Sequence, residues 1–143
     1  MSACLAGRRC THRGEANEVV GLLPLAADAI LVCPEVEGGL GTPRPPAEIV
    51  GGDGADVLDG RARVVTIDGD DVTDAFVRGS QAAVRAAAEA GVATAILKSR
   101  SPSCGCGLTY DGTFTHALVA GDGVTAAALR RAGIDVRTDE EAP

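Results

Sequence analysis

Five cysteines fall in three separate stretches of this 143-residue chain. They are Cys4 and Cys10 near the amino terminus, Cys33 after a short apolar run, and Cys104 and Cys106 in a glycine-rich segment. Thiolates gathered from several loops suit zinc or an iron–sulfur cluster, because soft ligands prefer these metals. No Cys-x-x-Cys pair or zinc-finger spacing occurs, which makes a closed structural zinc site less expected. The alternative is that these cysteines are small hydrophobic residues of the core.

A carboxylate and a hydroxyl accompany the thiols in the sequence. Glu35 lies two residues after Cys33, and Ser101 lies three residues before Cys104. In a cleft beside a metal, a carboxylate can act as a general base and a hydroxyl can donate to a ligand. The alternatives are an exposed loop acid and a serine that only satisfies the loop backbone. Arg44 could hold an anionic or carbonyl oxygen nearby.

A parallel sheet would position these loops. Residues 29–32 and 92–97 are short apolar runs typical of strands buried on both faces, and each leads into a cysteine loop. Small and apolar residues at three- and four-residue spacings predict a helix over 72–90, with Asp71 as N-cap and Gly91 closing it. Open α/β sheets bind ligands at the carboxyl ends of their strands, so we expect the cysteine loops to converge there.

The rest of the chain completes an α/β pattern. We predict an amino-terminal helix over 17–25, closed near Pro24, and a small antiparallel excursion over 47–67 with a tight turn at Asp59-Gly60. A second clear helix follows over 124–132, and a final strand over 134–136. The excursion would pair the strand-like residues Val57-Leu58 with 64–67. The expected fold is one α/β domain over 1–143: a small three-layer, Rossmann-like parallel sheet with a short antiparallel β-hairpin insertion.

Composition excludes several functions. Thirteen basic and twenty acidic residues give a formal charge of −7, which repels nucleic acid and anionic membranes. Only three residues are aromatic, too few for a base-stacking platform. No apolar run approaches the ~20 residues that a bilayer needs, and no signal pattern opens the chain, so we expect a cytoplasmic protein. Cysteines in that reducing compartment favour metal binding or catalysis over disulfides.

Six motifs follow one another along the chain. They are Ser2-Ala3-Cys4-Leu5-Ala6-Gly7-x-x-Cys10, Cys33-Pro34-Glu35-x-x-Gly38-Gly39-Leu40, Pro43-Arg44-x-Pro46-Ala47-Glu48, Asp71-Val72-Thr73, Leu97-Lys98-x-x-Ser101-Pro102-Ser103-Cys104-Gly105 and Tyr110-Asp111-Gly112-x-Phe114. In this order and spacing they resemble the DUF523 family, which includes the thiouracil desulfidases. The resemblance covers nearly the whole chain, and it is the combination of motifs, rather than any one of them, that is specific.

The resemblance implies a [4Fe–4S] cluster held by only three cysteines, with the fourth iron open to the substrate's sulfur. The ligands would be Cys4, Cys33 and Cys104, with Glu35 as acid–base residue and Ser101 as a catalytic or substrate-positioning hydroxyl. The implied partner is a small thiolated base such as 2-thiouracil, converted by water to the oxo base and sulfide without net redox change. Cys10 and Cys106 remain alternative ligands.

Two features depart from the family pattern. Met1 directly precedes the Ser-Ala-Cys motif, where the family has a fuller first strand, and residues 11–14 replace a more usual Arg-aromatic-Asp-Gly run. Two other functions compete with desulfuration: a non-catalytic iron–sulfur or sulfur-carrier module, and a zinc-stabilised domain that binds a small ligand.

Overall fold

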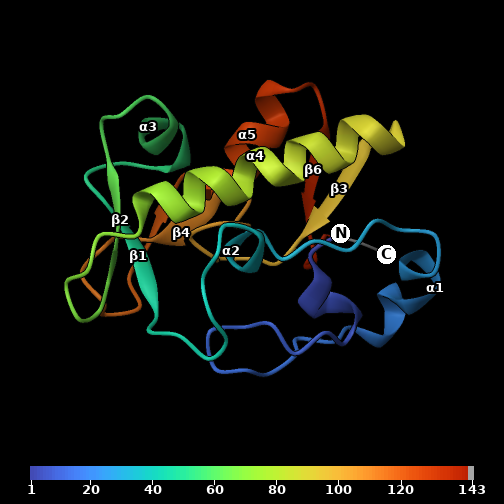
Figure 1. Cartoon of the computed structure of the whole chain (residues 1–143), viewed down its shortest axis with the longest axis horizontal. Helices are drawn as coiled ribbons and strands as arrows, with labels where there is room; N and C mark the ends of the chain where they lie inside the picture. The colour runs from blue at the N-terminus through green and yellow to red at the C-terminus, as the bar shows by residue number, and fades with distance from the viewer. Residues whose placement is uncertain (142–143) are drawn as a thin grey trace.

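A short parallel sheet forms the centre of the computed structural model, which describes residues 1–141. Strand β3 (Thr94–Leu97) pairs in parallel with β6 (Asp135–Thr138). On the other side of β3, the Ser2 N–H donates to the Ile96 carbonyl at 3.0 Å, and the Ala3 N–H donates to the Val32 carbonyl at 2.9 Å. The amino terminus therefore extends the sheet (Figure 1).

The strand predicted over residues 29–32 is wrong as a full element. Only Val32 forms a bridge, a parallel one to Ser2. The Val32 N–H donates to the Met1 carbonyl at 3.1 Å, but the 3₁₀ helix η1 (Ala3–Ala6) begins directly after Ser2 and turns away from this segment. A two-residue partner gives a few hydrogen bonds but no regular ladder.

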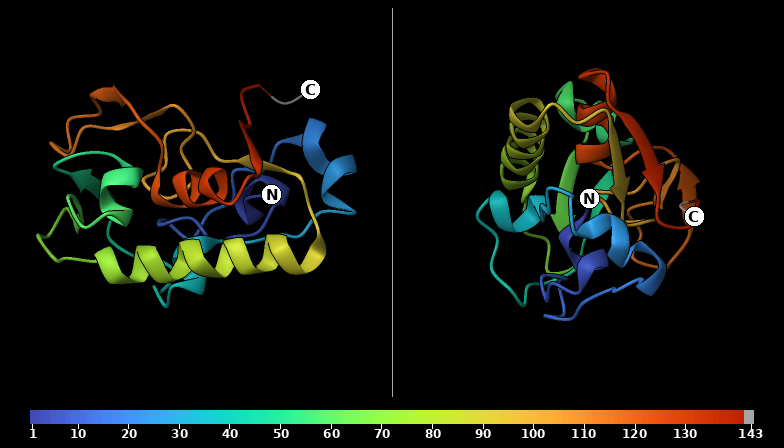
Figure 2. Two further views of the ribbon diagram at one scale, coloured as in Figure 1. Left: turned by 90° about the horizontal axis from the view of Figure 1, so that it is seen from above. Right: turned by 90° about the vertical axis from the view of Figure 1, so that its right-hand side faces the viewer.

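Two helices cover one face of this sheet. Helix α4 (Thr73–Ala90) runs along one side of the molecule with α5 (Val124–Arg131) beside it (Figure 2). Ala87 of α4 and Leu129 of α5 pack with Leu97 in one buried cluster. The prediction for α4 is confirmed within one residue: Val72 is the N-cap, while the Asp71 carboxylate still accepts the Thr73 N–H at 2.9 Å. Gly91 ends the helix in the left-handed conformation, as predicted.

An antiparallel pair lies at the far end of α4. Strand β1 (Ala47–Val50) pairs with β2 (Arg63–Thr66). The connection between them is not the predicted hairpin turn, because Val57 and Leu58 belong to helix α3 (Gly54–Leu58). A capping box starts this helix: Asp53 accepts the Asp56 N–H, and the Asp56 carboxylate accepts the Asp53 N–H. Two satisfied backbone donors favour the helix over the strand that the apolar pair indicated.

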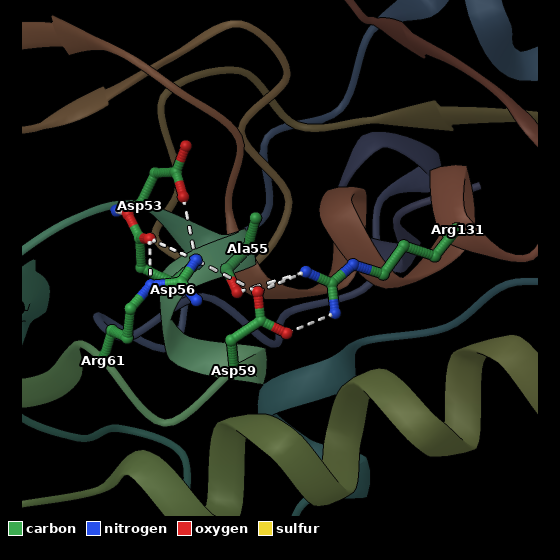
Figure 3. Close-up of polar contacts among 6 residues, drawn as sticks. All are labelled: Asp53, Ala55, Asp56, Asp59, Arg61 and Arg131. Atoms are coloured by element: carbon green, nitrogen blue, oxygen red, sulfur yellow. Dashed lines mark hydrogen bonds and ion pairs between the residues drawn. The ribbon is translucent and has the colours of Figure 1, made fainter.

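Charged side chains connect α3 to α5 (Figure 3). The Arg131 guanidinium donates to both carboxylate oxygens of Asp59 at 2.9 Å and to the Ala55 carbonyl at 3.3 Å. Arg61 donates to Asp56 and Asp59 from the other side. Because these groups are largely exposed, each pair adds little stability, but together they fix the orientation of α3 on α5.

The remaining elements are short. The helix expected over 17–25 is a 3₁₀ turn, η2 (Val20–Leu22), followed by α1 (Leu23–Ala26). Pro24 lies in the first turn of α1 rather than closing the helix, because the first turn does not need the N–H that proline lacks. Helix α2 (Pro34–Glu37) follows Cys33, and β4 (Leu108–Tyr110) pairs with β5 (Leu118–Ala120) in antiparallel fashion. The α/β class, with a parallel sheet and antiparallel insertions, is thus confirmed. Among the described residues no helix is both long and apolar enough to cross a membrane.

A candidate metal centre in a thiol-lined pocket

A pocket of about 510 Å³ lies where the amino-terminal segment and β3 end. Four thiols line it, and each of these cysteines is at most 9% exposed: Cys4, Cys10, Cys33 and Cys104. The three loops thus converge, as the parallel-sheet argument predicted. Cys106 does not line this pocket; its thiol contacts the Val136 carbonyl at 3.6 Å and a guanidinium nitrogen of Arg130 at 2.7 Å.

The loop that carries Cys104 is fixed by the amino-terminal end of α5. The Val124 N–H donates to the Pro102 carbonyl at 2.9 Å, and the Thr125 N–H donates to the Ser103 carbonyl at 2.8 Å. These are donors that a helix cannot satisfy internally, so the loop and the helix end stabilise each other. The buried hydroxyls of Ser103 and Thr125 also share a hydrogen bond of 2.9 Å.

Ser101 organises this loop from its other end. Its Oγ accepts the Ser103 N–H at 3.1 Å and the Cys104 N–H at 3.0 Å. A hydroxyl oxygen has two lone pairs and one proton to donate, so both acceptor positions are used. Ser101 lines the pocket half-buried, and its remaining capacity is the O–H donor.

Helix α2 positions Cys33 and Glu35. Cys33 is the N-cap residue, and the short helix packs directly on α4. The approach is close because Gly79 of α4 has no side chain: a Cβ there would overlap the Pro34 carbonyl, and one at Gly38 would overlap the Ala75 carbonyl. These two glycines set the depth at which Cys33 and Glu35 enter the pocket.

Arg44 joins the Glu35 turn to the Cys10 loop. One terminal nitrogen donates to Glu35 Oε2 at 3.1 Å and to the Cys10 carbonyl at 2.8 Å. The other donates to the Gly41 carbonyl and the Thr42 hydroxyl. The Arg44 side chain is only 6% exposed, and Figure 1 shows the dark-blue loop and the segment after α2 side by side. The sequence suggested that Arg44 could hold an anionic or carbonyl oxygen, and in the structure that oxygen is Oε2 of Glu35.

Burial sets the state of the thiols in the metal-free protein. It raises the pKa of Cys104 to about 12, partly offset by a hydrogen bond from Ser2 and reinforced by the nearby Cys4 and Glu35. Burial, with the charge of the neighbouring Cys33, raises the pKa of Cys10 to about 12. The pKa of Cys4 is also raised by burial. These thiols are protonated at neutral pH, and a bound metal would displace their protons.

The donor set fits an iron–sulfur cluster. Four buried cysteines line one pocket, and thiolates are the ligands that hold such clusters in proteins. Within residues 1–141, no group of three or more His, Cys, Asp or Glu side chains is placed to hold one metal ion.

The pocket also contains residues to which the sequence patterns assigned no role. Glu48 of β1 lines it and is 7% exposed, and Phe114 and His116 reach it from the β4–β5 loop. Arg100, Phe114 and His116 are the three non-glycine residues with φ near +60° in the described chain, and all three line this pocket. Backbone strain of this kind concentrates at ligand sites.

Three comparisons relate this chain to known proteins. The family model described as 2-thiouracil desulfurase matches residues 1–141. The Bacillus subtilis (strain 168) protein named "Uncharacterized protein YbbK" is 44% identical over 143 residues, covering 99% of this chain and 95% of that protein. A solved structure of the [4Fe-4S]-dependent thiouracil desulfidase TudS is 41% identical, with a TM-score of 0.86 over 99% of this chain and 90% of that one.

Proposed function

Because the chain belongs to the 2-thiouracil desulfurase family, we propose that it removes the sulfur of a thiolated pyrimidine such as 2-thiouracil, with water supplying the oxygen that replaces it. The chain is a desulfidase, and its cofactor is a [4Fe–4S] cluster. The observation that carries the proposed reaction is the meeting of buried thiols, Glu35 and Ser101 around one pocket. The reaction balances as thiocarbonyl plus water giving carbonyl plus hydrogen sulfide.

Three of the four pocket thiols would hold the cluster: Cys4, Cys33 and Cys104. A cluster bound in this way would supply a Lewis acid for the soft sulfur of a thiocarbonyl group. Cys10, the fourth pocket thiol, is the alternative to Cys4. Its carbonyl accepts hydrogen bonds from Arg44 at 2.8 Å and from the Cys33 thiol at 3.6 Å, so Cys10 lies beside a proposed ligand.

Glu35 is suited to take the proton of the attacking water. Oε2 is held by Arg44, while Oε1 makes no hydrogen bond within the described residues, leaving it available to the water. A general base must lie within hydrogen-bonding reach of the proton it removes, and the ion pair fixes where Oε1 points. The same carboxyl group can return that proton to the departing sulfur.

Ser101 is suited to donate a hydrogen bond from its hydroxyl group to the substrate. Because both of its lone pairs are used by backbone N–H groups, its hydroxyl proton points away from them. A donor oriented before the substrate arrives stabilises negative charge that develops on a ring heteroatom during water attack.

Anaerobic reconstitution with iron and sulfide tests the proposal. We expect a brown protein that converts 2-thiouracil to uracil with one sulfide per turnover. The same cluster without turnover of any thiobase would instead support a sulfur-carrier module, and a colourless zinc protein would contradict the cluster itself.

Cysteine variants test the ligand set in the same preparation. Cys104→Ala removes a proposed ligand, so the protein should no longer retain the cluster's visible absorbance. Cys106→Ala is the matched control, because this thiol lies two residues away but outside the pocket; it should keep both cluster and turnover. The reverse result would move the ligand assignment by two residues.

A further inference from the structure

A second carboxylate, Glu48, reaches the pocket from the side of β1. Its Oε1 accepts the Gly112 N–H at 3.0 Å and the Phe114 N–H at 3.2 Å, both from the loop between β4 and β5. Its Oε2 accepts no hydrogen bond from the described residues. A carboxylate with one oxygen fixed by two backbone donors has its other oxygen fixed in direction as well.

The other oxygen, Oε2, is not sealed from solvent. Among the described residues, Arg44 Nε is the one fully buried side-chain nitrogen or oxygen without a partner, so Glu48 Oε2 is accessible. The residue is 7% exposed and lines the pocket, from which we infer that Oε2 faces the space that a substrate would occupy. A substrate ring that enters displaces the water around this oxygen, so the ligand must supply a donor in its place.

The loop that Glu48 holds is shaped around the same space. Phe114 has φ of 58° and His116 has φ of 62°, backbone conformations that residues other than glycine rarely adopt. Gly112 lies so close to β1 that a Cβ there would come within 2.6 Å of the Ile49 carbonyl. Phe114 and Glu48 both line the pocket and are joined by the hydrogen bond from the Phe114 N–H, so an apolar residue and an acceptor stand next to each other in its lining.

We propose that Glu48 Oε2 accepts a hydrogen bond from a ring N–H of the thiolated base. The residue thereby selects substrates in which that ring nitrogen is unsubstituted. The inference rests on the proposed desulfidase function and specifies its substrate class: planar heterocycles with a free N–H next to the thiocarbonyl. A carboxylate only accepts, and a thioamide N–H is the donor that such a base offers. Phe114 supplies the apolar surface for the ring face.

Methylation of the ring nitrogen would leave Glu48 Oε2 without a donor. A site built to bind a substrate N–H discriminates strongly against an analogue that lacks it, because its own polar group is then left unpaired. For a hydrogen bond to a charged group, the expected loss in kcat/KM is roughly 10- to 100-fold. We expect this loss for one of two bases, 1-methyl-2-thiouracil or 3-methyl-2-thiouracil, relative to 2-thiouracil.

The test compares all three bases with the cluster-loaded wild type and with Glu48→Gln. In Glu48→Gln we expect kcat/KM for 2-thiouracil to fall by the same factor, mainly through KM, and the preference over the discriminated methyl base to shrink towards unity. Glu37→Gln is the matched control, because this exposed carboxylate lies on α2 outside the pocket. Unchanged secondary structure and cluster absorbance would show that each variant is folded.

Two outcomes would overturn the inference. If Glu48 only anchors its loop, Glu48→Gln lowers kcat/KM for all bases equally and the preference is unchanged. If the wild type converts both methyl bases with the same kcat/KM as 2-thiouracil, the site does not recognise a ring N–H, whatever the result with the variant. Failure of the wild type to convert 2-thiouracil would contradict the proposed function instead, and calorimetric binding of the same three bases would then still measure the N–H preference.

Discussion

Gly79 offers the sharpest test of how the fold positions the site. It lies on the buried face of α4, where the α2 backbone reaches it, and Gly79→Ala places a methyl group on the Pro34 carbonyl. Since α4 is a long helix packed against α5, the short helix α2 must yield. Its movement would carry Cys33 and Glu35 with it.

Two effects of opposite sign decide the stability of Gly79→Ala. Alanine within a helix is more favourable than glycine by about 1 kcal/mol. Overpacking a close contact costs about 1–3 kcal/mol, and an overlap with backbone belongs at the upper end of that range. The net expectation is a loss of about 2 kcal/mol in the free energy of unfolding. A catalytic group displaced by about 1 Å loses on the order of 100-fold in rate, so kcat should fall by at least tenfold.

Urea unfolding and the desulfuration assay measure these two effects. The exposed position Gln81 calibrates the helix term, because Gln81→Ala and Gln81→Gly differ only in helix propensity. If Gly79→Ala proves as stable as or more stable than the wild type, the close approach of α2 does not limit this position. Full activity in Gly79→Ala would contradict the claim that this contact sets the place of Glu35.

Three further perturbations address other contacts. Arg44→Met breaks the mostly buried pair with Glu35 and should lower the free energy of unfolding by about 3 kcal/mol in denaturant titration, together with kcat; unchanged values would mean that the pair is dispensable. Burial raises the pKa of Asp139, but hydrogen bonds from the Ser99 N–H and the charge of Lys98 outweigh it, so the pKa lies below its usual 3.8. Asp139 therefore stabilises the fold above that pH and loses its contribution as pH falls through the lowered pKa; Asp139→Asn should be less stable at pH 7, and thermal melts should show the difference vanishing in acid. Asp53→Ala removes the cap of α3 and should cost about 1 kcal/mol in the same denaturant titration without affecting turnover, and a loss of activity would refute that separation.

The sequence predicts those parts of the fold in which local and long-range preferences agree. Helix α4 has its apolar face, a carboxylate at its start and a glycine at its end, so its bounds follow within one residue. Strand β3 is an apolar run between a helix end and a loop. The α3 segment differs, because Val57 and Leu58 are good strand residues and the Asp53–Asp56 capping box is the stronger local signal.

The site shows the same division. The convergence of the cysteine loops is expected from the parallel-sheet argument, although only β3 forms as a full strand before one of them, and the motif resemblance singles out Cys33, Glu35 and Ser101. Contacts between distant segments do not follow from any local pattern. The pairing of Arg44 with Glu35 and the Cys10 carbonyl, and the hold of Glu48 on the 111–117 loop, each depend on side chains brought together only by the complete fold.

In the proposed reaction, water replaces sulfur at a cluster-bearing pocket without net redox chemistry. Mass spectrometry of the uracil formed from 2-thiouracil in ¹⁸O-labelled water, with cluster-loaded protein and no reductant, tests this step. We expect uracil that carries one ¹⁸O atom, and one sulfide released for each uracil formed. Unlabelled uracil, or turnover that requires a reductant, would contradict it.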